Sequence, residues 1–271
     1  MPLPDWAAGK VFGYPCNEEK FLHSVDEWSG TLRSVLEART SLVAIELGAG
    51  WGPWLVAAHA AARARGIDDI RLIGVEGMAE HIAMMRQHFI DNGIEASRHR
   101  IVHGIVGVRD GKAYFPKAKD ATIEWGGEAI FSKVQPPDTV ALPSVSLPTL
   151  MADFQRVDIV HCDIQGAEGE VLPAALPEMT KKVRRIVVGT HSRGIEHTLF
   201  GAFLAHGWKL EAEAACTFNI IEGRHYSKDD GTQVWANPQF DAPAVDVSGA
   251  DSQWGTRGPS KWLRLFGGRR A

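Results

Sequence analysis

Residues 43–52 read Val43-Ala44-Ile45-Glu46-Leu47-Gly48-Ala49-Gly50-Trp51-Gly52, an apolar run that ends in an acid and three alternating glycines. Glycine lets the backbone turn sharply and approach a ligand closely, because it has no Cβ. A helical stretch opens at Pro53, and a helix N-terminus offers unpaired N–H groups to a polar ligand. Strand, glycine turn and helix in this order predict a nucleotide-cofactor site in a doubly wound α/β domain.

The next expected strand, Ile70–Val75, is followed by Glu76-Gly77. A carboxylate offers several acceptor positions to the vicinal diol of a ribose. We therefore expect Glu76 to accept hydrogen bonds from ribose hydroxyls.

The glycine spacing favours one cofactor over another. The dinucleotide fingerprint G-x-G-x-x-G needs a third glycine for close helix–strand packing, and Pro53 stands at that position. The spacing G-x-G-x-G, with Glu46 two residues before the first glycine, resembles motif I of class I methyltransferases. That resemblance implies S-adenosylmethionine as the cofactor, with Glu46 facing its methionine part. The candidate cofactor-binding residues are Glu46, Gly48, Ala49, Gly50, Gly52, Glu76 and Gly77.

Strand-like and helix-like segments alternate along the chain. The sequence predicts strands at 42–47, 70–75, 100–106, 157–164, 185–189 and 208–213, and helices at 24–39, 53–65, 78–92, from Glu168 onward, and 195–206. Alternation of this kind favours a parallel sheet with crossover helices. We expect a doubly wound, mostly parallel seven-stranded sheet with helices on both faces, Rossmann-like and of the class I methyltransferase type. Pro173 is expected to kink or restart the helix after Glu168.

Residues 41–240 are expected to form the cofactor-binding domain, and three segments are expected to add to its core. Residues 1–40 are expected to form an N-terminal helical cap. The long segment 107–150 is an insertion between the third and fourth strands, with an apparent hairpin at 111–116, and is a candidate substrate-facing wall. Residues 241–271 form a C-terminal tail whose apolar and basic residues suggest either peripheral membrane contact or folding onto the domain.

A second motif sharpens the family resemblance. The fourth strand runs into Asp163-Ile164-Gln165-Gly166-Ala167-Glu168, which resembles the D-x-E-G-A-E run of the FkbM family of class I methyltransferases. The segment 145–150 and Thr190-His191 after the fifth strand also resemble that family, over about Leu42 to Trp235 in all. The resemblance implies O-methylation of hydroxyls, mostly on macrolides and sugars.

The chain departs from the family at two places. Gly50 stands where the family usually has asparagine, and Gln165 where it usually has glutamate. The second change removes one carboxylate that could serve as a base or metal ligand. A catalytically silent cofactor-binding module is therefore kept as an alternative.

Methyl transfer to an alcohol is an in-line displacement, in which holding the reactants in line supplies much of the acceleration and a general base helps to remove the hydroxyl proton. Asp163 and His191 are the catalytic candidates, because Asp163 lies at the end of the fourth strand and His191 after the fifth, at the carboxyl edge of the sheet, where ligands bind. The pKa range of histidine makes His191 the expected neutral base. Asp163 is equally an N-cap or turn residue by position.

Asp163, Glu168 and His191 are also candidate ligands of a divalent metal such as Mg²⁺. The expected function is S-adenosylmethionine-dependent O-methylation of a sugar, glycan or other polyhydroxylated natural product. N-methylation on the same fold and an NAD(P)-dependent oxidoreductase are the alternatives.

The composition limits the partners and the location that can be expected for the protein. The net charge of −4 gives no bulk attraction to nucleic acid. The three cysteines lack a metal-type spacing and suggest a reducing compartment. The sequence shows no membrane-spanning run or signal segment, so a cytoplasmic location is expected, with a homo-oligomer left open.

Overall fold

The computed structural model describes residues 24–121, 123–222 and 224–240, apart from the side chains of residues 224–227. The expected tail at 241–271 and the first 23 residues of the expected cap lie outside this part of the chain. Every residue described belongs to one unit, Met1–Phe240. Within the described ranges no helix is long and apolar enough to cross a bilayer.

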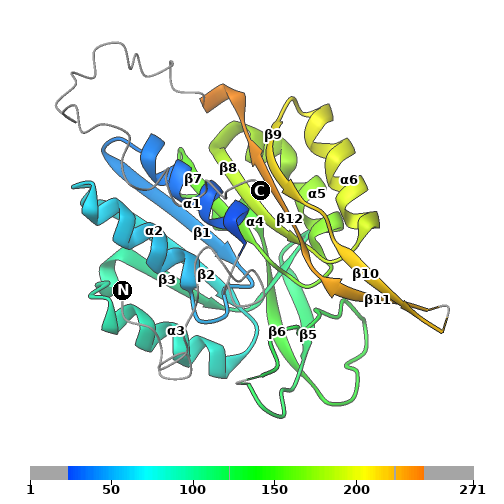
Figure 1. The fold of residues 1–271 in the computed structure, drawn as a ribbon. Coiled ribbons are helices and arrows are strands. Elements are labelled where there is room, and N and C mark those ends of the chain that lie inside the picture. Colours follow the sequence, from blue (N-terminus) through cyan, green and yellow to red (C-terminus); the bar gives the residue numbers. More distant parts are fainter. Residues whose placement is uncertain (1–23, 122, 223, 241–271) are drawn as a thin grey trace, which may run out of the picture. The chain divides into compact units, whose positions relative to one another are not determined.

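A seven-stranded sheet forms the centre of this unit (Figure 1) and has the strand order β3-β2-β1-β7-β8-β12-β9. Neighbours from β3 to β8 are parallel, whereas β12 is antiparallel to both β8 and β9. The predicted fold class is therefore confirmed. The strands are β1 (Ser41–Leu47), β2 (Asp69–Glu76), β3 (His99–His103), β7 (Val157–Cys162), β8 (Val183–Thr190), β9 (Lys209–Ala214) and β12 (Gly231–Ala236).

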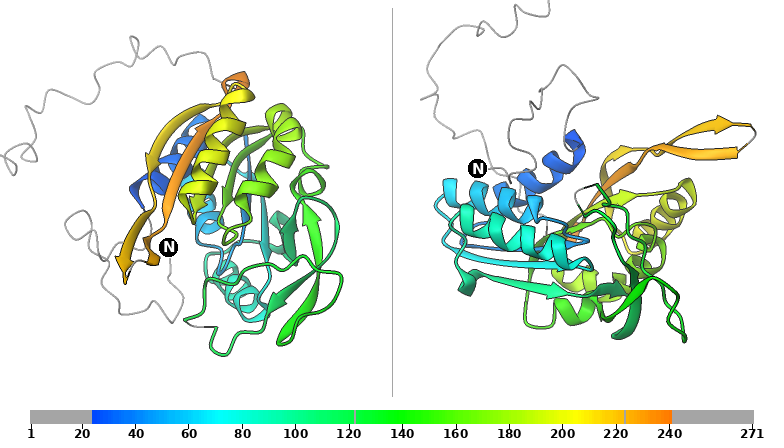
Figure 2. Two further views of the ribbon diagram at one scale, coloured as in Figure 1. Left: turned by 90° about the vertical axis from the view of Figure 1, so that its right-hand side faces the viewer. Right: turned by 90° about the horizontal axis from the view of Figure 1, so that it is seen from below.

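Helices cover both faces of the sheet (Figures 1 and 2). Alternate residues of β1 enter two apolar clusters: Leu42 and Ala44 pack with α2 and α3, and Val43 and Ile45 with α5 and α6. This period-2 alternation is what a strand buried on both faces requires. The helices are α1 (Val25–Glu37), α2 (Pro53–Ala64), α3 (Ala79–Asp91), α4 (Leu147–Leu150), α5 (Glu168–Lys182), α6 (Arg193–Ala205), and the short 3₁₀ turns η3 (Ala96–Arg98) and η4 (Pro238–Phe240).

Helix α1 lies on the same face as α2 and contacts β7, β8 and β12. Its first turn is closed by a capping box, in which Ser24 and Glu27 bond each other's backbone N–H groups. Gly30 allows close packing, because a Cβ there would lie 2.5 Å from a methyl carbon of Val187 in β8. The expected cap helix is thus packed directly against the sheet.

Two sequence expectations about the third strand and the insertion need correction. The strand predicted at 100–106 is split, because β3 ends at His103 and Gly104 then approaches the Pro143 carbonyl too closely for a Cβ. The residues that follow form β4 (Ile105–Gly107) in a separate sheet of order β4-β6-β5. The strand expected in a local hairpin, β5 (Gly111–Pro116), pairs instead with the distant β6 (Thr139–Ser146).

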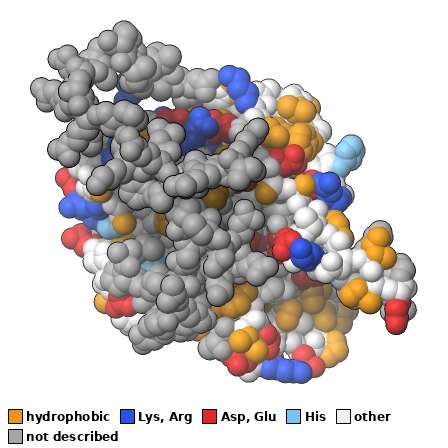
Figure 3. Space-filling model, viewed as in Figure 1, with side chains coloured by type: hydrophobic (Ala, Val, Ile, Leu, Met, Phe, Trp, Pro, Cys, Tyr) orange, Lys and Arg blue, Asp and Glu red, His pale blue; other side chains and the backbone are white. Residues whose placement is uncertain are grey.

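Two further differences lie in the second half of the chain. Helix α5 is a single helix through Pro173 and Pro177, so the expected restart is wrong. Between β9 and β12 the chain forms a hairpin, β10 (Thr217–Ile221) and β11 (Arg224–Asp229), that extends beyond the main sheet (Figure 2). Apolar side chains of β10 are exposed there, and hydrophobic atoms are visible on this hairpin in Figure 3.

Candidate functional site

A cavity of about 340 Å³ opens at the carboxyl ends of β1, β2 and β7. This is the edge where open α/β sheets bind ligands. Of the predicted cofactor-binding residues, the cavity is lined by Glu46, Gly48, Ala49, Gly50, Glu76 and Gly77. Asp163 and Gln165, from the second motif, line it as well.

The glycine turn forms one wall of the cavity. Gly48 and Gly50 have φ values of 71° and 51°, in the left-handed region that favours glycine. A Cβ on Gly48 would lie 1.7 Å from the Asp163 carbonyl oxygen, so glycine is required for the ends of β1 and β7 to approach this closely. Gly52 plays a different part: it is the N-cap of α2 and packs on Met85 and Phe89, outside the cavity lining.

Glu46 is directed at the N-terminus of α2. Its Oε2 accepts a hydrogen bond from the Leu55 N–H at 3.1 Å, and the residue is 2% exposed. Burial raises the pKa of Glu46 well above its usual value, and the nearby Asp163 and Glu76 carboxylates contribute to the rise. The helix end that could bind an anionic ligand is therefore already occupied by an acidic side chain.

Glu76 is fixed between the glycine turn and the start of α3. Its Oε2 accepts from the Gly50 N–H at 2.8 Å, and its Oε1 accepts from the Met78 N–H at 2.7 Å. An ionised carboxylate has about four acceptor positions, and the His81 Nδ1 also lies 3.7 Å from Oε1, so Glu76 keeps capacity for a further donor at the cavity surface.

The β2 side of the cavity is closed by an aromatic pair. The Trp125 ring from the insertion stacks on His81 of α3, with centroids 4.1 Å apart and planes at 9°. Burial lowers the pKa of His81, but Glu76 and the Ala121 carbonyl outweigh this and raise it overall. The insertion thus forms part of the cavity wall, and Trp125 lies beside Gly50.

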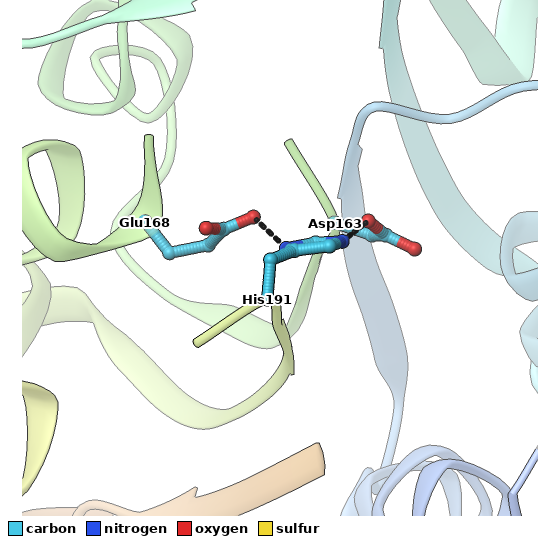
Figure 4. A group of neighbouring side chains, drawn as sticks. All are labelled: Asp163, Glu168 and His191. Carbon is cyan, nitrogen blue, oxygen red and sulfur yellow. Dashed lines mark ion pairs between the residues drawn. The ribbon is translucent and has the colours of Figure 1, made fainter. Parts of the chain in front are cut away.

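On the β7 side, Asp163, His191 and Glu168 form a row (Figure 4). The His191 Nε2 lies 3.2 Å from Asp163 Oδ1, and its Nδ1 lies 3.1 Å from Glu168 Oε1. Glu168 is fully buried at the start of α5 and accepts N–H groups of Ile164 and Gly166, whereas the Asp163 side chain is 41% exposed.

The charge of His191 differs from the expected neutral base. Burial lowers its pKa, but the Asp163 and Glu168 carboxylates raise it further, to about 10. The ring is therefore protonated at neutral pH, with a carboxylate at each nitrogen. In this arrangement His191 cannot accept a proton, and among the two catalytic candidates only Asp163 lines the cavity.

The three predicted metal ligands do come together, with ligand atoms within 4.8 Å of one another. Their arrangement does not fit a metal ion, because the imidazole stands between the two carboxylates. A metal on one ring nitrogen would face only one of them, and Glu168 is already engaged by backbone N–H groups. We interpret the group as a carboxylate–imidazolium–carboxylate triad.

Gln165 holds Asp163 from the other side. Its side-chain amide donates to Asp163 Oδ1 at 2.9 Å. The backbone of Gln165 has a φ of 54°, a left-handed conformation that is costly for a residue other than glycine and is often found at functional sites. Asp163 Oδ1 thus accepts from the Gln165 amide and pairs with the His191 imidazolium, which fixes the carboxylate at the cavity edge.

Sequence reasoning missed a second acid–imidazole pair in the cavity. His161 was not among the predicted site residues, but it lines the cavity with Glu27, and the His161 Nε2 lies 3.2 Å from Glu27 Oε1. One signal was available in the sequence: Ser24-x-x-Glu27 has the pattern of a capping box.

Comparison with known proteins identifies one related sequence. The chain is 34% identical over 226 residues to "Putative methyltransferase" of Jannaschia sp. (strain CCS1), and the match covers 81% of each chain. No family model matches the chain.

Solved structures show weaker similarity. Methyltransferase FkbM from Methylobacillus flagellatus KT is 13% identical, with a TM-score of 0.47, over 73% of this chain and 44% of that one. Precorrin-6y C5,15-methyltransferase from Geobacter metallireducens GS-15 is 12% identical, with a TM-score of 0.44, over 84% and 93% of the two chains. Similarity this distant carries no functional argument.

Proposed function

Because this chain belongs to the methyltransferase family of its Jannaschia relative, we propose that it transfers the methyl group of S-adenosylmethionine to a hydroxyl of a sugar, glycan or other polyhydroxylated natural product. The FkbM-like run from Asp163 to Glu168 supports a hydroxyl acceptor. The proposal depends most on one observation: the glycine turn, Glu76 and Asp163 border a single cavity.

The Glu46 carboxylate argues against the dinucleotide alternative. In dinucleotide-binding folds the pyrophosphate sits at the N-terminus of the helix after the glycine turn. Here Glu46 accepts an N–H of that helix end, and a pyrophosphate would meet a buried acid instead of free donors. A cationic ligand suits the cavity better, because the Glu76 and Asp163 carboxylates line it.

The residues present fit S-adenosylmethionine. The cavity of about 340 Å³ lies within the usual range of ligand pockets, roughly 300–1,000 Å³. Glu76 would accept from the ribose hydroxyls, and the glycine turn permits close approach of the ligand to the backbone. When bound, the cofactor would supply an electrophilic methyl group on a sulfonium.

In this proposal Asp163 is the general base. The Asp163 carboxylate, which lines the cavity, would take up the proton that the acceptor hydroxyl loses on methylation. His191 acts as a positioning residue: its imidazolium and the Gln165 amide hold Asp163 Oδ1. Glu168 in turn orients His191.

The test is methyl transfer from isotopically labelled S-adenosylmethionine to a panel of sugars, polyketide alcohols and amines. We expect hydroxylated acceptors to be labelled, and we expect Asp163→Asn to lower kcat by about 10²–10⁴-fold while cofactor affinity stays near that of the wild type. Asp153→Asn, at an exposed turn residue outside the cavity, is the matched control. If only amines are labelled and Asp163→Asn retains full activity, the N-methyltransferase alternative replaces this proposal.

A further inference from the structure

The two ends of the cavity differ in chemistry. Because the sheet order is β3-β2-β1-β7, lining residues can be placed along its edge. Beyond Glu76, on the β2 and β3 side, the lining is mainly apolar and includes Ile105, Phe115 and Trp125. On the β1 and β7 side it is polar and includes Glu46, Asp163, His161 and Glu27.

Glu27 is the one lining residue that α1 supplies within the described part of the chain. One carboxylate oxygen, Oε2, accepts the Ser24 N–H at 2.8 Å and closes the capping box. The other, Oε1, faces the His161 Nε2 at 3.2 Å. The side chain is 13% exposed, so its charge is largely withdrawn from bulk water.

His161 is held in place from two directions. Its ring stacks on Trp54 of α2, with centroids 4.8 Å apart and planes at 23°, and its side chain is 5% exposed. In the sheet it pairs with Glu46 in β1, so both side chains project from the same face. The imidazole therefore presents Nε2 to Glu27 in a fixed geometry.

We propose that Glu27 binds the ammonium group at the amino-acid end of the cofactor, and that His161 positions the Glu27 carboxylate for this contact. The inference rests on the proposed function. With the ribose at Glu76, the purine lies at the apolar end and the amino-acid chain runs past Glu46 toward β7. An ammonium buried there needs a carboxylate partner, and Glu27 lines that end of the cavity from outside the sheet.

The test compares two ligands that differ only in the amino group: S-adenosylhomocysteine and its desamino analogue. Calorimetric titration of the full chain gives the ratio of their dissociation constants for wild type and variants. We expect the amino group to improve wild-type binding by roughly tenfold, as a charged hydrogen bond does. In Glu27→Gln, which can still complete the capping box, the two ligands should bind within about twofold of each other.

Two further variants separate positioning from folding. His161→Phe keeps an aromatic ring on Trp54 but removes the donor to Glu27, so it should lose the discrimination as Glu27→Gln does. His161→Gln restores an N–H donor and should recover much of the discrimination between the two ligands. Asp26→Asn changes the same charge one residue away, outside the cavity, and should keep the wild-type ratio.

The outcomes are distinguishable. A tenfold ratio that persists in Glu27→Gln would overturn this inference and assign the amino group to Glu46 or Asp163, while leaving the proposed function intact. Failure of both ligands to bind the wild type would overturn the proposed function, and this inference with it.

Discussion

At the scale of single residues, Glu76 connects the glycine turn to the expected ribose site. Its two oxygens accept the N–H groups of Gly50 and Met78, so the carboxylate is preorganised before any ligand arrives. A ribose diol would add donors to an acceptor that is already fixed and 7% exposed. Preorganisation of this kind lowers the cost of ordering on binding.

We expect Glu76→Gln to weaken binding of S-adenosylmethionine by at least about tenfold, because hydrogen bonds to a charged group contribute roughly 1.5–3 kcal/mol. Glu80→Gln, at an exposed position on α3, removes the same charge and should leave the affinity within about twofold. Equilibrium titration of both variants measures the difference. Equal affinity of Glu76→Gln and wild type would remove Glu76 from the ribose site.

The raised pKa of His191 leads to a prediction about how the stability of the fold depends on pH. Its folded-state pKa of about 10 lies above the ordinary value of 6.5, because two carboxylates outweigh its burial. The imidazolium therefore stabilises the fold fully below pH 6.5, and this contribution is lost as the pH rises through about 10. The destabilisation caused by His191→Gln should be greatest near pH 6.5 and shrink toward pH 10.

Urea denaturation of wild type and His191→Gln across that pH range measures this effect. His197→Gln, at an exposed position on α6, is the control and should change stability little at any pH. A difference between wild type and His191→Gln that grows with pH would mean that His191 is not the buried cation of the triad.

At the scale of elements, α1 is held on the sheet by a buried guanidinium. Arg185 of β8 is 2% exposed and contacts Glu37 of α1 and Glu211 of β9. It also donates to the Ser34 hydroxyl of α1 at 3.2 Å. Because α1 carries Glu27 into the cavity, this anchor at its far end also supports the polar end of the site.

We expect Arg185→Ala to lower the free energy of unfolding by about 3 kcal/mol, since removing one partner of a buried ion pair leaves the others uncompensated. Arg33→Ala removes an arginine that contacts the same Glu211 from a half-exposed position, and surface pairs contribute about 0–1 kcal/mol. Chemical denaturation compares the two. Similar small losses for both variants would show that α1 is held by apolar packing alone.

At the scale of the whole molecule, the features that could be predicted from the sequence are those that depend on residues close together in the chain. The strand–glycine–helix order around Gly48 and the acid at Glu76 depend on neighbours in the chain, and both were placed correctly at the cavity. The β12 strand was not located, because Thr232 and Gln233 interrupt its apolar pattern and its burial depends on β8 and β9.

The cavity also contains features that no local pattern reveals. Glu27 and His161 are far apart in sequence and meet only because α1 packs across β7 and β8. The charge of His191 likewise depends on two carboxylates that the fold brings to its ring, whereas the residue type alone suggested a neutral base.

The most direct test of S-adenosylmethionine as the cofactor is calorimetric titration of the full chain with S-adenosylhomocysteine and, separately, with NAD. We expect saturable one-to-one binding of S-adenosylhomocysteine and none of NAD, because the Glu46 carboxyl group occupies the helix end that a pyrophosphate would need. Saturable binding of NAD, without binding of S-adenosylhomocysteine, would contradict the proposed cofactor.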